Sequence, residues 1–344
     1  MLKKYLLGLC LLAMVVTVHA GTVDINRPEV KSFIDEVANR DHLDRDWLTH
    51  VLASAEFRSS IIEAMEKPAE RVRPWSEYRQ IFMTDKRIRE GREFYAEHQK
   101  QLESASRRTG VPAEIIAAIV GVETSYGRSM GKYRVLDSLA TLAFDYPPRA
   151  TYFRGELEQF LLLSKEAAFD PLTALGSYAG AMGAPQFMPK SYRSMARDGD
   201  NDGRIDLWNN WSDIIESVAN YFVANGWHRN EPIVSVAELR DPDVEGLPGT
   251  RIEFSETVAS LKTKGVEFTA LASNGAAALF IALRGTDGPT YRVGYHNFWV
   301  ITRYNRSPMY ALAVSELAAA IAPTQSTEAT AESTSGAHRS QITR

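Results

Sequence analysis

The sequence Ile119-Val120-Gly121-Val122-Glu123-Thr124-Ser125-Tyr126-Gly127 places one carboxylate at the end of an apolar segment, just before a turn. Residues 111–122 are apolar on nearly every side, which predicts a buried helix. Pro112 suits the first helical position. We therefore expect a helical domain that buries this helix and holds Glu123 at its C-terminal end.

Glu123 shares a helical face with the apolar residues Val120, Ile119 and Ile116. A carboxyl held against such a face loses hydration, and the nearby helix C-terminus adds negative potential. Both effects raise the pKa of a carboxyl, which suits a general acid in glycosidic-bond cleavage. A helix-terminal glutamate that reaches into water, or one in a structural network, fits the same nine residues.

The N-terminus has the pattern of a secretory signal over residues 1–20. Two lysines precede an apolar run over residues 6–18, and small residues suit cleavage after Ala20. The run is short for a membrane span. Cys10 lies in a poor lipidation motif, so we expect a soluble periplasmic protein without a membrane anchor. Because Cys10 is the only cysteine, the mature chain is held by its core and not by disulfides.

Hydrophobic periodicity predicts a mainly α (α+β) fold. Helical patterns occupy residues 30–38, 46–55, 85–107, 111–123, 152–163, 213–223 and 309–321, and short strands are expected over 251–254, 278–283 and 290–293. We expect a helical catalytic domain of residues 21–231 and 296–322, with a small α/β subdomain of residues 232–295. Residues 323–344 lack apolar periodicity and are expected to be disordered.

A loop at residues 198–213 has the pattern of an EF-hand calcium loop. Oxygen side chains occupy its positions 1, 3, 5 and 9, and a glycine occupies position 6. Position 12 is Asn209 and not the bidentate Glu. Asp213 fits the role of that missing carboxylate and also that of the cap of the next helix, with Glu216 as its capping-box partner, and the two roles are compatible. The alternative is an Asp-rich turn without metal, and we expect weak, structural binding.

Two further clusters have no unique interpretation. Small residues over 176–189 allow close approach of backbone or of a ligand. In the ligand reading, Ser177 and Gln186 donate hydrogen bonds to a sugar and Phe187 or Tyr178 stacks on it. The other reading is tight packing of helices. The polar and aromatic segment over 302–307 suits sugar contacts, but an ordinary loop has the same composition.

Several other function classes lack support in the sequence. The formal charge of −4 falls to −6 when the two lysines of the signal are removed, which does not favour nucleic-acid binding. The seven histidines show no His-Glu-x-x-His spacing, so a catalytic zinc site is not indicated. A Gly-x-Ser-x-Gly elbow is also missing from the sequence.

Taken together, the four clusters resemble the lytic murein transglycosylases of the membrane-bound B type, and more closely their soluble, non-lipidated members. Gly-Val-Glu-Thr, Gly-Ala-Met-Gly-x-x-Gln-Phe-Met-Pro, the Asp-rich loop and Arg-Tyr-Asn occur in the family's order over residues 25–322. The resemblance implies a lysozyme-like helical catalytic domain with a deep cleft and a small domain at its side. Two departures are Pro148, where a second arginine is common, and Pro185, where glycine is usual.

The resemblance also implies the site residues. Glu123 becomes the single catalytic acid/base. The positions that match the substrate cleft are Arg149, Tyr152, Ser177, Gln186, Phe187, Tyr221, Tyr304 and Asn305. The positions that match the metal loop are Asp198, Asp200, Asp202, the carbonyl of Arg204, and Asp213, which would hold a structural Ca²⁺ or Na⁺. No cofactor is implied for the chemistry.

The implied reaction cleaves the β-1,4 bond between N-acetylmuramic acid and N-acetylglucosamine and forms a 1,6-anhydro ring. A hydrolytic muramidase and a non-catalytic, calcium-dependent murein-binding scaffold are the alternatives. The implied partners are the glycan strands of peptidoglycan and murein synthases, with no nucleic acid and no membrane, and the protein is expected to be a monomer.

Overall fold

The computed structural model describes residues 21–67, 73–167, 169–241 and 251–323, which fall into two compact units. The first unit comprises the described residues of Met1–Pro68, Gly131–Ala181 and Met188–Lys190. The second comprises those of Ala69–Met130, Met182–Phe187 and Ser191–Arg344. The predicted signal, including Cys10, and nearly all of the predicted tail lie outside the described residues.

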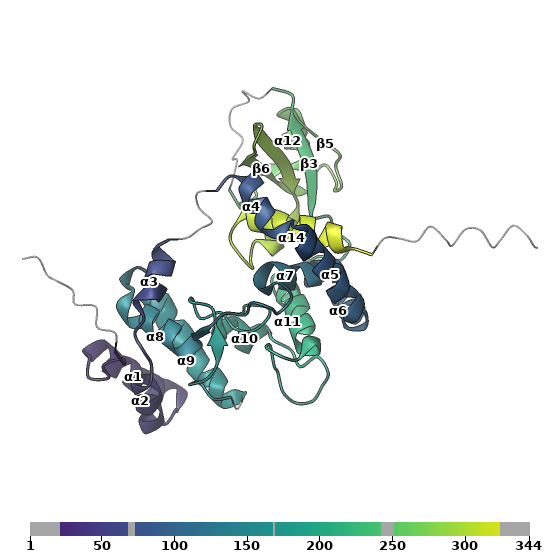
Figure 1. Ribbon diagram of the computed structural model, residues 1–344. Coiled ribbons are helices and arrows are strands. Elements are labelled where there is room, and N and C mark those ends of the chain that lie inside the picture. The colour runs from purple at the N-terminus through teal and green to yellow at the C-terminus, as the bar shows by residue number, and fades with distance from the viewer. Residues whose placement is uncertain (1–20, 68–72, 168, 242–250, 324–344) are drawn as a thin grey trace, which may run out of the picture. The chain divides into compact units, whose positions relative to one another are not determined.

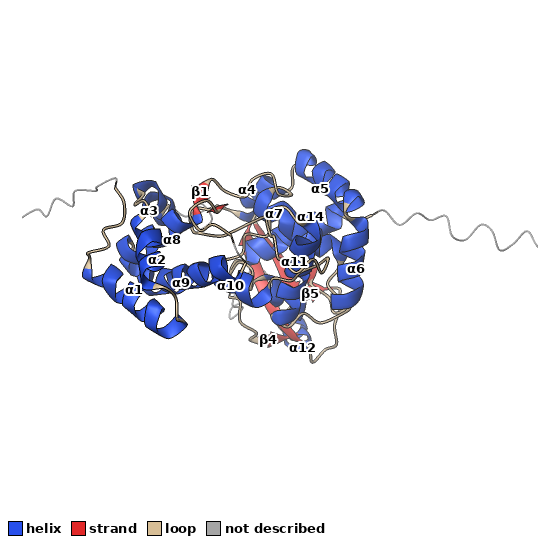
Figure 2. Ribbon diagram, turned by 90° about the horizontal axis from the view of Figure 1, so that it is seen from below, coloured by secondary structure: helices blue, strands red, loops and turns tan. Residues whose placement is uncertain are grey.

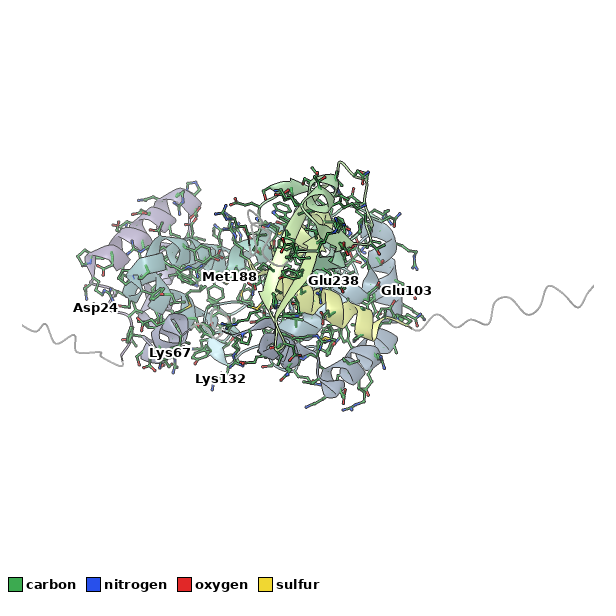
Figure 3. All side chains as sticks on the ribbon, turned by 90° about the horizontal axis from the view of Figure 1, so that it is seen from above. Asp24, Lys67, Glu103, Lys132, Met188 and Glu238 are labelled. Atoms are coloured by element: carbon green, nitrogen blue, oxygen red, sulfur yellow. The ribbon has the colours of Figure 1, made fainter. Side chains whose placement is uncertain are left out.

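The first unit is helical with one short antiparallel strand pair. Its elements are α1 (Pro28–Asp41), α2 (Arg45–Ala53), α3 (Ser59–Glu66), β1 (Tyr133–Arg134), α8 (Val135–Asp145), the 3-10 turn η1 (Pro147–Arg149), α9 (Ala150–Glu166) and β2 (Leu175–Gly176). Asp24 and Lys67, labelled in Figure 3, lie near the two ends of its first described segment.

A buried charge network holds the first unit together. Asp137 is fully buried, and its carboxylate accepts hydrogen bonds from the backbone N–H of Glu56 and from the side chains of Arg58 and Arg134. A buried carboxylate is tolerated because these charged donors replace its lost hydration. The network therefore joins the loop between α2 and α3 to the start of α8.

The second unit combines helices with an antiparallel five-stranded sheet (Figures 1 and 2). Its helices are α4 (Trp75–Phe82), α5 (Asp85–Glu97), α6 (Gln99–Thr109), α7 (Ala113–Thr124), α11 (Trp211–Ala224), α12 (Val258–Thr263), α13 (His296–Ile301) and α14 (Pro308–Ile321). Along the chain, α10 (Pro189–Met195) begins in the first unit and ends in the second. The helix α7 packs against α5, α6, α11 and α14, so it lies at the centre of the helical part.

The sheet has the strand order β4-β6-β7-β3-β5. Its strands are β3 (Val234–Leu239), β4 (Glu256–Thr257), β5 (Val266–Phe268), β6 (Ala277–Arg284) and β7 (Pro289–Gly294). Buried apolar residues from the strands and α12 form one core on one face of the sheet, with Phe280 and Leu261 among them. On β3 the side chains alternate between this core and solvent, and Glu238 is exposed.

Most of the predicted elements are confirmed, and several boundaries are corrected. Pro112 is the residue before α7 and not its first helical residue. The pattern over 85–107 forms two helices, because the backbone leaves helical geometry at His98, whose buried ring contacts those of Phe94 and Trp211. No strand forms over 251–254, where the chain is largely exposed, and β4 follows it. The sequence pattern did not predict the helices α3, α4, α8, α10, α12 and α13 or the strands β1 to β5.

The described residues contain no helix that is both long and apolar enough to cross a membrane.

Candidate active site

Glu123 lies in the last turn of α7, where its side chain is half-buried. The helix before it is buried almost throughout, which confirms the expectation from the apolar run. Immediately after the helix, Ser125, Tyr126 and Gly127 all have left-handed backbone conformations, with φ values of 52°, 61° and 80°. Such conformations cost about 1–3 kcal/mol at non-glycine residues and persist only where the surroundings enforce them.

Two sets of contacts enforce this turn. Thr124 donates its hydroxyl to the carbonyl of Ala184 at 2.9 Å and accepts the N–H of Gly127 at 3.0 Å. From α5, the guanidinium of Arg87 donates to the carbonyl of Gly121, and Glu90 pairs with Arg128. These contacts therefore hold the turn in its left-handed conformation. This conformation in turn fixes the direction of the Glu123 side chain.

Glu123 accepts a hydrogen bond from a buried phenol. The hydroxyl of Tyr310, in the first turn of α14, donates to Glu123 Oε1 at 2.6 Å. Burial raises the pKa of Tyr310 well above its ordinary value, and the nearby charge of Glu123 adds to the shift. Tyr310 therefore stays protonated, and remains a donor, throughout the physiological pH range.

The charge of Glu123 also affects the pKa values of two more tyrosines. Burial, aided by Glu123, raises the pKa of Tyr304 well above its usual range and that of Tyr221 to about 12. The hydroxyl of Tyr304 donates to the carbonyl of Pro185 at 2.6 Å, and that of Tyr221 donates to the carbonyl of Arg303 at 2.7 Å. Both phenols thus tie separate chain segments together around the carboxylate.

The segment over 182–187 is shaped by close backbone packing. Gly183 has φ 70°, and a Cβ there would collide with the carbonyl of Leu207, so the small residue serves packing. The side-chain amide of Gln186 donates to the carbonyls of Met130 and Gly183. Both of its N–H groups are used locally. The expected donation from Gln186 to a sugar stays a prediction.

Phe187 is buried, with 2% of its surface exposed. Its ring contacts those of Tyr221 and Tyr304 at centroid distances of 5.5 and 5.9 Å. The ring therefore packs against the two tyrosines. It is buried and does not offer the exposed face for stacking on a sugar that the sequence suggested. Asn305 follows Tyr304 and is half-buried.

Three of the expected substrate residues belong to the first unit. The guanidinium of Arg149 lies 4.6 Å from the ring centroid of Tyr152, whose side chain is 42% exposed. Ser177 accepts the backbone N–H groups of Ala179 and Ala181 with its hydroxyl oxygen, which leaves the hydroxyl proton for another acceptor.

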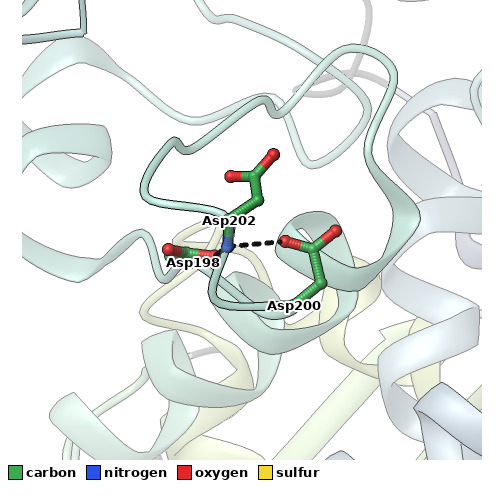
Figure 4. A group of neighbouring side chains, drawn as sticks. All are labelled: Asp198, Asp200 and Asp202. Atoms are coloured by element: carbon green, nitrogen blue, oxygen red, sulfur yellow. Dashed lines mark hydrogen bonds between the residues drawn. The ribbon is translucent and has the colours of Figure 1, made fainter.

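The acidic loop brings three carboxylates together (Figure 4). One carboxylate oxygen from each of Asp198, Asp200 and Asp202 lies within 4.8 Å of the others. Two oxygens on opposite sides of one Ca²⁺ lie about 4.6–5.2 Å apart. The spacing of the three side chains therefore fits a calcium ion.

Asp213 is fully buried and closes the base of this loop. Its two oxygens accept the backbone N–H groups of Gly199 and Asp206, at 2.7 and 2.8 Å. The role as helix cap is wrong, because Asn210 caps α11 by accepting the N–H groups of Ser212 and Asp213. The expected capping-box partner, Glu216, instead pairs with Arg108.

Comparisons with known proteins place these features in a family. A model described as "Transglycosylase SLT domain" matches residues 26–319. The chain is 41% identical over 307 residues to membrane-bound lytic murein transglycosylase B of Escherichia coli K12, covering 86% of this chain and 83% of the relative. The chain belongs to the B-type lytic murein transglycosylases.

Solved structures of lytic transglycosylases share the fold. Catenated SltB1 from Pseudomonas aeruginosa matches with a TM-score of 0.82 and 46% identity, over 86% of this chain and 97% of the other. The Escherichia coli enzyme Slt35 in complex with calcium matches with a TM-score of 0.80 and 39% identity, over 88% and 95%. SltB3 from Pseudomonas aeruginosa, in complex with NAG-NAM-pentapeptide, matches with a TM-score of 0.76 and 29% identity, over 85% and 78%. The lytic transglycosylase described here therefore has the family's lysozyme-like, mostly helical fold with a small sheet subdomain.

The sequence reading of this lytic transglycosylase missed two contacts at the site. Tyr310 lies in the helix predicted over 309–321 and Arg87 in the one predicted over 85–107, but neither residue was assigned a contact at the site. A phenol in the first turn of a mostly apolar helix was the available signal for Tyr310. Arg87 gave no signal, because its partner is a backbone carbonyl 34 residues away.

We predict that Tyr310→Phe lowers the turnover of murein about tenfold and moves the alkaline limb of the pH–activity profile upward. The variant loses a hydrogen bond that favours the ionised carboxylate, and a phenylalanine ring still fills the buried space. Rates measured across pH on purified murein test this. Tyr95→Phe, which also removes a hydroxyl from a buried ring of the second unit, is the control. An unchanged rate and profile in Tyr310→Phe would contradict the role of the bond.

Proposed function

We propose that Glu123 is the single acid/base of a lytic transglycosylase that cleaves the β-1,4 bond between N-acetylmuramic acid and N-acetylglucosamine in peptidoglycan. The observation that carries the proposal is the half-buried carboxyl of Glu123 with a phenol donating to one of its oxygens. With Tyr310 donating to Oε1, the protonated carboxyl of Glu123 serves as the acid toward the glycosidic oxygen.

In the second half of the reaction, the carboxylate of Glu123 accepts the proton of the 6-hydroxyl of the muramic acid. The hydroxyl oxygen attacks the anomeric carbon and closes a 1,6-anhydro ring, so that water is not consumed. Retaining and inverting hydrolases use a second carboxylate for the corresponding step. The groups described around Glu123 include three phenols, Tyr221, Tyr304 and Tyr310.

The remaining substrate contacts are proposed from the resemblance and from local geometry. The exposed ring of Tyr152, with Arg149 beside it, offers a face on which a sugar can stack. The amide oxygen of Gln186 is suited to accept from a sugar hydroxyl or an N-acetyl N–H. We propose that Ser177 and Asn305 complete these polar contacts.

We predict that Glu123→Gln keeps the fold but lowers the turnover of purified murein by at least 10²-fold, since an amide neither donates nor accepts the required proton and general acid–base action is worth roughly 10²–10⁴-fold. Glu114→Gln, the same substitution in the first turn of the same helix, is the control and should keep its activity. Retention of more than a tenth of wild-type turnover by a folded Glu123→Gln variant would refute the assignment.

We further propose that Asp198, Asp200 and Asp202, with the carbonyl of Arg204 and with Asp213, hold a structural Ca²⁺. The oxygen spacing and the calcium complex of the relative Slt35 support this proposal. Asn209 stands at position 12 and donates its side-chain amide to Asp206. Because the bidentate Glu is missing, we expect a dissociation constant on the order of 10⁻⁴–10⁻³ M.

Calcium should raise the melting temperature of this protein by mass action. At a hundredfold excess over the dissociation constant the gain is about 2.7 kcal/mol. Chelation should lower the melting temperature more than the turnover at room temperature, because the loop carries no catalytic group. The double variant Asp200→Ala, Asp202→Ala should lose the calcium-dependent shift, whereas Asp287→Ala, an exposed aspartate of the same unit, should keep it. Identical melting curves of the wild type with chelator and with Ca²⁺ at about 100 mM, a hundredfold excess over the weakest expected dissociation constant, would rule out the site.

We propose a soluble periplasmic location, on the signal pattern over residues 1–20 and the poor lipidation motif at Cys10. The glycan strands of peptidoglycan are the proposed partner. Recovery of the native protein from the membrane fraction with an acylated Cys10 would overturn the location.

A further inference from the structure

A line of aromatic rings in the second unit ends at two arginines. Phe254, His296 and Trp299 lie with ring centroids 5.8–6.4 Å apart in each pair, and His228 stacks on His296 at 3.9 Å. Phe254 is 36% exposed, and His228 is also exposed. The guanidinium of Arg303 lies 4.4 Å from the ring of Trp299. We call Phe254, His296, Trp299, Arg303 and Arg306 the aromatic–arginine strip.

The two arginines of the strip lack a carboxylate in the part of the chain that the structure describes. Neither Arg303 nor Arg306 forms an ion pair there. The side chain of Arg303 donates to the neighbouring Thr302 hydroxyl, at 3.3 Å, and its buried Nε has no partner among the described residues. Burial and the nearby positive charge of Arg306 lower the pKa of Arg303. Two adjacent cations without an anion repel each other, and a bound carboxylate would relieve that repulsion.

The strip begins at the candidate active site. The backbone carbonyl of Arg303 accepts the hydroxyl of Tyr221, and the next residue is Tyr304, whose pKa is raised in part by the charge of Glu123. A ligand that reaches Glu123 is thus close to Arg303 within the same unit. The rings beyond it offer an apolar surface to whatever extends from that ligand.

We propose that the aromatic–arginine strip is a subsite for the peptide of a peptidoglycan strand, with Arg303 and Arg306 binding a carboxylate of that peptide. This inference rests on the proposed function, because it places the peptide beside the glycan bond that Glu123 cleaves. A peptide carries a terminal carboxylate, and the relative SltB3 is known in complex with NAG-NAM-pentapeptide. Guanidinium groups match the planar geometry of carboxylates, and the ring of Trp299 holds the Arg303 guanidinium flat. The aliphatic parts of the peptide would lie on Trp299 and His296.

The experiment compares two substrates, one with charged and one with neutral peptide carboxyl groups. One is a preparation of peptide-bearing glycan strands, and the other is the same preparation with its peptide carboxylates converted to methylamides. We expect the wild type to cleave the native strands with a kcat/KM about 10- to 100-fold higher, the range for a charge-assisted hydrogen bond. Arg306→Gln and Arg303→Gln should bring the ratio of the two kcat/KM values close to one. Arg89→Gln, at an exposed position on α5, is the control and should keep the wild-type ratio.

The advantage should also fall at high salt, because Arg306 is exposed and its charge is screened. Melting temperatures identify a variant that does not fold, and Arg306→Gln alone suffices if Arg303→Gln fails. A wild-type ratio of one, or a ratio that both folded arginine variants leave unchanged, would overturn the proposal. The reducing or anhydro ends of the products are measured in the same digests, so a failure of the proposed reaction is seen separately.

Discussion

The candidate active site depends on the left-handed turn that ends α7. Three successive residues with positive φ, only one of them glycine, bring the chain sharply away from the helix directly after Glu123. Such a turn is unfavourable by itself, and it is held by the Thr124 bond to Ala184 and by the Arg87 bond to Gly121. The close packing of Gly91 and Gly121 against the Tyr126 ring adds to this, because a Cβ at either glycine would collide with the ring.

Around this turn, the hydroxyl groups of tyrosines donate hydrogen bonds that apolar side chains cannot make. Tyr221, Tyr304 and Tyr310 come from α11, from the segment after α13 and from α14, and each donates to a different acceptor. Their rings, with Phe187, pack against one another, so that each phenol is fixed in position. A carboxylate in such surroundings is partly dehydrated but still hydrogen-bonded, which is the environment that a proton-transfer group requires.

The sequence predicted those features that depend on local pattern. The apolar run before Glu123 predicted a buried helix, and the spacing of aspartates over 198–202 predicted the group of carboxylates that the structure shows. It failed where the outcome depends on distant contacts. The Tyr310 bond to Glu123 joins residues 187 positions apart. The sequence allowed Asp213 to be a metal ligand, a helix cap or both, but its burial and its bonds to Gly199 and Asp206 are set by how the loop folds back. The alternation over 251–254 predicted a strand that does not form.

The central claim is that one carboxylate suffices because the substrate supplies its own nucleophile. Digestion of purified murein in ¹⁸O-labelled water, followed by mass spectrometry of the released fragments, tests it most directly. The account predicts fragments that end in 1,6-anhydro-N-acetylmuramic acid and carry no label at the cleaved position. Reducing ends that contain ¹⁸O, and are lost in Glu123→Gln, would show that water is the nucleophile and would contradict the account.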